Sequence, residues 1–349
     1  MDSSPRIAIV TCLRDEGPFL MEWIAHLRAL GVTSVLAFTN DCRDGTEALL
    51  DALAPAGVTQ VPQGEVLAAG GKAPQWRAME AAWAHPVCRD ADWLAHLDPD
   101  EYVALDGPRS LPELIGSMPG AEAIALPWRL FGSAGRVAPG AGTTPARFPR
   151  AAPAGLAYPP LASCFKTLFR RDGPFTGFGI HRPAQSAPPV LFDDTGRRDD
   201  ALARAPERII LWRAGRAPEG RRVQLNHYST RSVHEFLVKA GRGLPNHTGR
   251  SIGLDYWVER NFNETRCTMI EPQLAALEVE AARLRAMPGV AAAEAETRAW
   301  HAARLREILR TPEGTRLYGH LALAAGSLAP APALGRSLMD VQAAAAVAP

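Results

Sequence analysis

Residues 6–31 read RIAIVTCLRDEGPFLMEWIAHLRALG and predict a strand that is followed at once by a helix. The run 6–12 is short, apolar and rich in β-branched residues, as buried strands are. Apolar residues then recur at helical spacing over 19–30, with Pro18 near the start of the helix and Gly31 at its end. A strand joined to a helix in this way is the basic unit of an open α/β sheet.

The alternation of strand and helix continues along the chain and then gives way to helices. We predict further strands at 34–39, 58–62, 92–97, 123–131 and 163–169. We predict helices at 47–53, 73–85, 233–240, 272–287 and 294–309. Two Pro-rich segments, 132–160 and 182–222, are expected to be long loops. The pattern therefore indicates an α/β sheet flanked by helices, with a helical C-terminal extension.

Composition narrows the class of protein. The chain has 349 residues, of which 47% are hydrophobic and 21% charged, so it has the make-up of a folded globular protein. Its 38 Lys and Arg residues are balanced by 37 Asp and Glu residues, which argues against nucleic acid as the main partner. The five cysteines are odd in number and form no C-x-x-C pair, so neither a disulfide framework nor a zinc cluster is indicated.

The cysteine pattern and the N-terminus also bear on localisation. The first residues lack the basic and apolar regions of a signal peptide, and no stretch approaches the ~18 uninterrupted apolar residues of a membrane span. We therefore expect a cytoplasmic protein with no transmembrane segment. Peripheral contact with a membrane is compatible with this expectation.

The sharpest chemical signal is the sequence Asp98-Pro99-Asp100-Glu101, which directly follows the apolar strand predicted at 92–97. In an open α/β sheet, ligands bind outside the carboxyl ends of the strands. Two aspartates separated by one residue can direct their carboxylates to one point, and carboxylates are the ligands that Mg2+ and Mn2+ prefer. The alternative interpretation is that these residues form a solvated turn.

Five ordered segments resemble one family. The segments VTCLRDEGPFLMEWIAHLRALGV (10–32), FTNDCRDGTEALLDAL (38–53) and DWLAHLDPDEYVAL (92–105) resemble the bacterial family 2-like glycosyltransferases of the GT-A fold. Phe165-Lys166-Thr167 with 179–183 looks like the lysine strand and following histidine of that branch. Leu225-Asn226-His227-Tyr228 with 239–243 looks like its H-Y…K-x-x-R-G region.

The resemblance implies a fold and a division into domains. The fold would be of the GT-A type, an open mixed sheet flanked by helices. The resemblance covers about residues 5–245, which we assign to a nucleotide-sugar transferase domain. We assign 246–327 to a helical extension, and we expect the Ala- and Pro-rich tail at 328–349 to be disordered.

The resemblance also implies roles for individual residues. Asp98 and Asp100 would hold Mn2+ or Mg2+, with His227 as a further ligand, and through the metal they would hold the diphosphate of the donor. The nucleotide pocket would be edged by Arg14, Asp15 and Glu16, with Asp41 and Gln75 contacting the base or ribose. A diphosphate carries more charge than one divalent cation neutralises, so Lys166, Lys239 and Arg242 are expected near it. For the catalytic base, the candidates are Glu101, Asp172 and His181.

The sequence thus predicts a metal-dependent glycosyltransferase. Such an enzyme would move a sugar from a nucleotide diphosphate sugar, here a UDP-sugar, to a glycan or other hydroxyl acceptor in surface polysaccharide assembly. One alternative is a degenerate GT-A fold that serves as a carbohydrate- or partner-binding module. Another is a metal-dependent phosphate hydrolase that uses the same acidic strand end, although its known type carries the D-x-D after the first strand, where Thr11 and Cys12 stand here.

Overall fold

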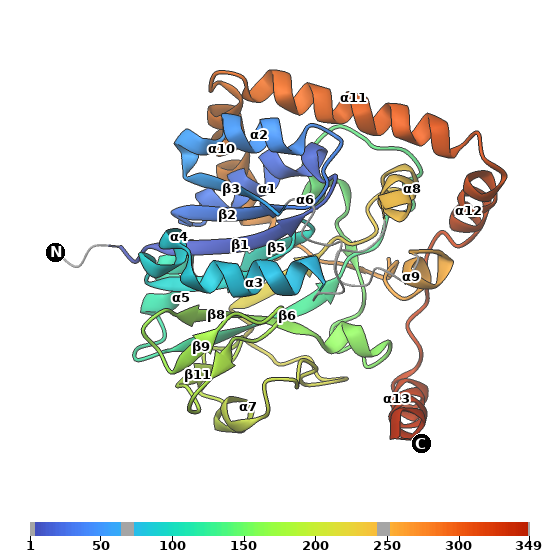
Figure 1. Cartoon of the computed structure of the whole chain (residues 1–349). Coiled ribbons are helices and arrows are strands. Elements are labelled where there is room, and N and C mark those ends of the chain that lie inside the picture. The colour runs from blue at the N-terminus through green and yellow to red at the C-terminus, as the bar shows by residue number, and fades with distance from the viewer. Residues whose placement is uncertain (1–3, 64–72, 243–251, 348–349) are drawn as a thin grey trace.

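The computed structural model describes residues 4–63, 73–242 and 252–347 and has a large mixed sheet with helices on both faces (Figure 1). The strands are β1 Ile7–Leu13, β2 Ser34–Thr39, β3 Val58–Pro62, β4 Trp93–His96, β5 Glu101–Leu105, β6 Ala123–Leu130, β7 Arg150–Ala151, β8 Phe165–Arg170, β9 Phe175–Gly177, β10 Ala184–Gln185, β11 Leu191–Phe192, β12 Val223–His227 and β13 Thr265–Arg266. In the described part of the chain, nine of them form one sheet in the order β3-β2-β1-β4-β8-β6-β12-β5, with β11 beside β6.

The directions of the strands bring several of their carboxyl ends to one edge of this sheet. Strands β3, β2, β1 and β4 are parallel to one another, and β8 is antiparallel to both β4 and β6. Strand β12 is parallel to β6 and antiparallel to β5. As a result, β1, β2, β4, β6 and β12 all point their carboxyl ends to the same edge. This mixed α/β sheet confirms the predicted fold class.

The helices cover the sheet in two layers. They are α1 Gly17–Ala29, α2 Thr46–Ala52, α3 Pro74–Ala84, α4 Pro86–Arg89, α5 Leu111–Gly116, α6 Thr144–Arg147, α7 Asp200–Arg204, α8 Val233–Arg242, α9 Leu254–Val258, α10 Leu274–Arg285, α11 Val290–Ile308, α12 Pro312–Leu323 and α13 Pro332–Val347, with 3-10 turns at Ala54–Ala56, Pro160–Ser163 and Glu271–Gln273. Ile7 and Ile9 of β1 pack with α1, α2 and α10, whereas Ala8 and Val10 pack with α3 on the other face. Successive side chains of β1 point to opposite faces of the sheet, so β1 contributes to the core on each face.

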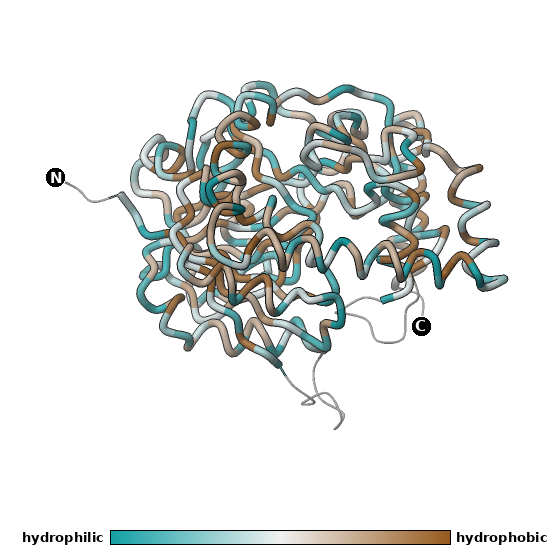
Figure 2. The backbone as a smooth tube through the Cα atoms, turned by 90° about the horizontal axis from the view of Figure 1, so that it is seen from above, coloured by the Kyte–Doolittle hydropathy of each residue, from teal (hydrophilic) through white to brown (hydrophobic). Residues whose placement is uncertain are grey.

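The C-terminal helices pack onto the sheet domain. Leu277, Leu284 and Val290 belong to the same buried cluster as Trp23 of α1, and α11 crosses above α2 toward α8 and α12 (Figure 1). Figure 2 shows the hydrophobic stretches of the backbone gathered toward the inside of the molecule. Among the described helices, none is long and apolar enough to cross a membrane.

Some details differ from the sequence-based expectation. The tail that we expected to be disordered contains α13, whose residue Gln342 donates a hydrogen bond to the Tyr158 hydroxyl at 3.2 Å. Its Ala-rich composition favours a helix even without a clear apolar period. The loop predicted at 132–160 contains α6 and β7, and β5 was not predicted because its five residues follow β4 after a short turn. The boundary that we place between residues 245 and 246 lies outside the described residues.

Candidate active site

The Asp98-Pro99-Asp100 turn lies between β4 and β5, at the edge where the parallel strands end. Strand β5 begins at Glu101, which is paired in register with His227 at the end of β12. The backbone N–H of Tyr228 donates to the carbonyl of Asp100 at 2.7 Å and holds the turn against the end of β12. Sheet pairing therefore brings His227 next to the acidic turn, although more than a hundred residues separate them.

Asp100 is buried and is paired with a lysine from α8. The Lys239 Nζ donates to Asp100 Oδ2 at 2.8 Å and to the carbonyl of Ser229 at 2.9 Å. The Nε2 of His227 lies 3.5 Å from Asp100 Oδ1. Burial raises the pKa of the Asp100 carboxyl, but the charge of Lys239 and the contact with His227 outweigh burial and hold that pKa well below its usual range. Asp100 is therefore a carboxylate at neutral pH.

Asp98 has its own lysine, from a different element. The Nζ of Lys166, a fully buried residue of β8, donates to Asp98 Oδ2 at 3.0 Å. On the other oxygen, Gln75 Nε2 of α3 donates to Asp98 Oδ1 at 3.2 Å, and His96 Nε2 lies 3.6 Å away. Burial lowers the pKa of the Lys166 ammonium, but Asp98 and Glu101 raise it above its ordinary value, so Lys166 stays charged.

Glu101 completes the turn from within the core. Its Oε2 accepts the backbone N–H of Asp98 at 2.8 Å and lies 3.4 Å from the Lys166 Nζ. Burial raises the pKa of the Glu101 carboxyl to about 8, with Lys166 opposing and Asp98 reinforcing that rise. Both contacts point into the protein. Glu101 therefore positions Asp98 and Lys166.

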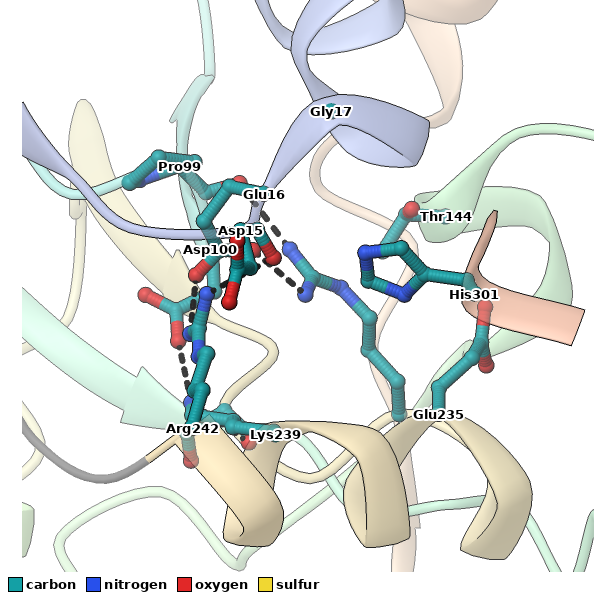
Figure 3. A network of polar contacts seen from close by, with 12 residues as sticks. Asp15, Glu16, Gly17, Pro99, Asp100, Thr144, Glu235, Lys239, Arg242 and His301 are labelled. Carbon is teal, nitrogen blue, oxygen red and sulfur yellow. Dashed lines mark hydrogen bonds and ion pairs between the residues drawn. The ribbon is translucent and has the colours of Figure 1, made fainter. Parts of the chain in front are cut away.

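A second layer of charge surrounds Asp100 (Figure 3). Glu16, at the start of α1, accepts from Arg242 of α8, whose Nη1 also donates to the Asp15 carbonyl at 3.1 Å. Arg231 lies in the same cluster: its Nη1 is 3.5 Å from Glu16 Oε2, and its Nη2 donates to the Pro99 carbonyl at 3.1 Å. The acidic turn is thus surrounded by cations from three separate segments.

Two histidines flank one tryptophan beside the turn. The ring of Trp128 lies 4.2 Å from the ring of His227 and 5.3 Å from the ring of His181, centroid to centroid. The Nδ1 of His181 is 2.9 Å from the carbonyl of Phe165. A carbonyl only accepts, so Nδ1 carries the proton and Nε2 of His181 is left as an acceptor. Burial and the charge of Lys166 lower the pKa of His181 to about 3, so the ring is neutral.

The structure brings most of the predicted site residues together. Around the acidic turn it gathers Glu16, Gln75, Asp98, Asp100, Glu101, Lys166, His227, Lys239 and Arg242. Arg14 contributes its backbone carbonyl, which accepts from Arg242. Asp41 is exposed after β2 and adopts a positive φ of 49°.

Asp172 does not belong to this cluster. It follows the far end of β8 and is paired with Arg170, with Oδ2 2.6 Å from Nη2. Because Lys166 lies near the start of β8, Asp172 is at the opposite edge of the sheet. Its candidacy as the catalytic base was therefore wrong, and the pattern Arg170-Arg171-Asp172-Gly173 is a charged turn.

Sequence reasoning missed two residues of the cluster. The sequence pattern gives His96 no role in the site, but its ring lies between Gln75 and Lys166, with Nε2 3.3 Å from Gln75 Nε2 and Nδ1 3.1 Å from Lys166 Nζ. The sequence does contain a signal for His96. It is two residues from Asp98, and residues two apart along a strand point to the same side. Arg231 has no motif around it; its positive φ of 51° and its position over the Phe19 ring, at 3.6 Å, arise from tertiary packing.

The arrangement does not fit the expected Mn2+ or Mg2+ site. Among the residues that the structure describes, no group of three or more His, Cys, Asp or Glu side chains is placed to hold a metal ion. Asp98 and Asp100 are each neutralised by a separate lysine, so a divalent cation would have to displace Lys166 or Lys239. Metal dependence stays a prediction.

Comparison with known proteins adds little. No family model and no curated protein matches the sequence. Similar solved structures include a mycobacterial protein, with 18% identity over 36% of this chain and 41% of that chain and a TM-score of 0.25. They also include glucosyl-3-phosphoglycerate synthase from Mycobacterium tuberculosis in complex with phosphoglyceric acid, with 15% identity over 36% of this chain and 44% of that chain and a TM-score of 0.24. The matches span less than half of those chains, and similarity at this level carries no argument about function.

Proposed function

We propose that this protein is a glycosyltransferase that moves a sugar from a UDP-sugar to a hydroxyl acceptor. One observation carries the proposal: the Asp98–Lys166 and Asp100–Lys239 pairs join three segments of the family resemblance at the carboxyl edge of the sheet. Ligands of open α/β sheets bind at this edge. The expected place in surface polysaccharide assembly stays a prediction.

The charges of the cluster suit the departure of a nucleoside diphosphate. Transfer breaks the bond between the anomeric carbon and the diphosphate oxygen, and negative charge grows on the leaving group. Preorganised cations stabilise such charge without reorganising at the moment of reaction. In the proposal, Lys166, Lys239 and Arg242 have this task, and Asp98 and Asp100 hold the two lysines in position.

The acceptor hydroxyl must lose a proton as the new bond forms. A general base needs a free acceptor atom within hydrogen-bond reach of that hydroxyl. Of the base candidates from the sequence, His181 has such an atom, its Nε2, because its Nδ1–H is used by the Phe165 carbonyl. We therefore propose that this atom of His181 accepts a hydrogen bond from the acceptor hydroxyl and orients it, since a pKa of about 3 makes the ring too weak a base to hold the proton at neutral pH.

Calorimetric titration with UDP and with uridine tests the proposal. Wild-type protein is expected to bind UDP at least about tenfold more tightly than uridine, because charge-assisted hydrogen bonds to the diphosphate contribute about 1.5–3 kcal/mol each. The substitutions Lys166→Met and Lys239→Met should remove most of that difference. Arg198→Met is the matched control, since Arg198 is an exposed cation paired with Asp200.

Three results would contradict transfer. Equal affinity for UDP and uridine would show that the protein has no site for the diphosphate. Binding of a glycan with no dependence on nucleotide would favour the binding module. Release of phosphate from a phosphomonoester would favour the hydrolase. Repeating the titration with Mn2+ tests metal dependence separately, and a screen of donor hydrolysis across nucleotide sugars would identify the donor.

A further inference from the structure

A large cleft lies beside β5 and β12, and neither Lys166 nor Lys239 lines it. Its volume is ≈ 950 Å³, and it is lined by the end of β5, the start of β12, part of β6 and residues 265–276. Strand β12 separates the two places: Gln224, near its start, lines the cleft, and His227, at its end, contacts Asp100. The cleft is therefore not the candidate donor site.

Arg129 of β6 is the unusual residue in this cleft. Its Nε donates to the carbonyl of Ala152 at 3.1 Å. Within the described ranges, its two terminal nitrogens make no hydrogen bond and no carboxylate pairs with it. Burial lowers the pKa of Arg129, with the neighbouring charge of Arg221 acting in the same direction. A guanidinium keeps its charge under these conditions, and a partly buried charge without a counterion is costly.

Arg221 is the neighbour that makes an anion site. Its Nε donates to Asp194 Oδ2 at 2.7 Å and its Nη1 to Gln224 Oε1 at 2.8 Å, so the side chain is held in place. Two more arginines, Arg109 and Arg266, line the same cleft. Of the described residues that line it, only Asp106 is a carboxylate. Arg109, Arg221 and Arg266 are each paired with a carboxylate, so among the described residues that line the cleft Arg129 is the arginine whose charge is left for a negatively charged ligand.

A second cavity adjoins the arginines of this cleft. It shares Arg129 and Arg221 with the cleft, and it is also lined by Trp128, by Arg213 and by Asp194, the carboxylate that pairs with Arg213 and Arg221. The indole N–H of Trp128 is buried and has no hydrogen-bond acceptor within the described residues. Because neighbouring side chains of a strand point to opposite faces, Arg129 and not Trp128 supplies the donors that face the cleft.

We propose that Arg129 and Arg221 bind the carboxylate or phosphate group of a small ligand in this cleft. A guanidinium presents parallel N–H donors that match either oxyanion, and the free terminal nitrogens of Arg129 supply them. The proposal does not depend on the proposed transferase function, because neither Lys166 nor Lys239, which pair with Asp98 and Asp100, lines the cleft.

Calorimetric titration of the full chain with inorganic phosphate, with glucuronate and with glucose tests this site. Phosphate or glucuronate is expected to bind, and glucose, which lacks the anionic group, is not. The substitution Arg129→Gln should weaken binding of the anion by at least about tenfold, as expected for loss of charge-assisted hydrogen bonds. Arg109→Gln is the control, since Arg109 lines the same cleft but is exposed and paired with Glu113 at 3.0 Å.

A chemical measurement on the wild-type protein tests the site even if Arg129→Gln does not fold. Phenylglyoxal modifies accessible arginines, and mass mapping of peptides reports each site. The bound anion should protect Arg129 but not the exposed Arg198. Phosphate and glucuronate distinguish a free inorganic ion from an acidic sugar as the preferred ligand.

The outcomes are decisive in either direction. Selective protection of Arg129, or loss of anion binding in Arg129→Gln with UDP binding unchanged, would support the site. Absence of binding by both anions, equal binding by Arg129→Gln, or displacement of the anion by UDP would overturn it. Failure of UDP binding alone would contradict the proposed transferase and leave this site unaffected.

Discussion

Each aspartate of the Asp98-Pro99-Asp100 turn owes its ionisation to a lysine from a distant part of the chain. Asp98 depends on Lys166 of β8, and Asp100 depends on Lys239 of α8. A buried ion pair stabilises little compared with a well-packed apolar pair, but removing one partner leaves an uncompensated charge in the protein. The turn is therefore expected to be sensitive to single substitutions and tolerant of matched double ones.

Lys239→Met is predicted to lower the free energy of unfolding by about 3 kcal/mol, because it leaves the Asp100 carboxylate buried without its counterion. Adding Asp100→Asn should recover most of this loss. Urea denaturation measures both variants. Arg283→Met serves as the control, since Arg283 is exposed and its pair with Glu280 should contribute at most about 1 kcal/mol. A double variant no more stable than Lys239→Met would contradict the pairing.

His26 is predicted to contribute to acid sensitivity. Burial lowers the pKa of His26 to about 4 from an ordinary value of 6.5, so between these values the unfolded chain binds a proton that the folded chain does not. The contribution of neutral His26 to the free energy of unfolding is therefore fully present above pH 6.5. It is lost as the pH falls toward 4. The loss attributable to this group is at most roughly 3 kcal/mol.

His26→Phe removes the titrating group and keeps a ring beside Tyr102, whose ring lies 5.0 Å away. The variant should lose stability less steeply than the wild type between pH 6.5 and pH 4, as measured by urea denaturation at a series of pH values. Identical slopes for the two proteins would show that His26 does not bind the proton.

At the scale of elements, α8 links the candidate site to the C-terminal helices. Val233, Phe236 and Leu237 pack against Trp257 of α9 and Leu321 of α12. Lys239, in the next turn of the helix, reaches Asp100. The extension that follows residue 252 therefore acts on the site through α8, which it helps to position.

The start of α1 is predicted to tolerate no side chain at Gly17. A Cβ at this position would lie 2.4 Å from Cγ2 of Thr297 in α11, so α1 and α11 would have to separate. Overpacking of this kind costs about 1–3 kcal/mol. Gly17→Ala should therefore lower the melting temperature. The matched change Gly116→Ala should be neutral or slightly stabilising, because a Cβ added at this helical glycine would meet no described atom within 4 Å beyond its own helix and chain neighbours.

At the scale of the whole molecule, the sheet and the C-terminal helices share one core. Leu277 of α10 is fully buried in the cluster that contains Ile7 of β1 and Trp23 of α1. A common core makes the two parts unfold together. We therefore expect a single cooperative thermal transition for the chain.

Leu277→Ala tests this expectation. Truncation of a buried leucine costs about 2–5 kcal/mol through lost burial and the cavity left behind. The substitution should shift one transition as a whole, seen both by calorimetry and by tryptophan fluorescence. Leu323→Ala, at a position 87% exposed, is the control. Two separate transitions, of which only one moves, would show that the extension folds independently.

Local pattern was enough to predict much of the sheet domain. The strands at 34–39 and 58–62 agree with β2 and β3 residue for residue, and the helix at 73–85 agrees closely with α3. The acidic turn was also predicted from its place after a strand, whereas Lys166, Lys239 and Arg242 were expected from the family resemblance. Apolar periodicity and the position of polar residues at strand ends are properties of short segments, so they can be read from the chain directly.

By itself, the sequence determined the order of strands and helices and the chemical character of the acidic turn. Only the tertiary structure decided that each aspartate is paired with its own lysine and that Arg231 joins the cluster, whereas Asp172 lies at the far edge. It also decided that no carboxylate of the described residues pairs with Arg129. The physical reason is that the state of a buried charge depends on which other charges long-range packing places around it.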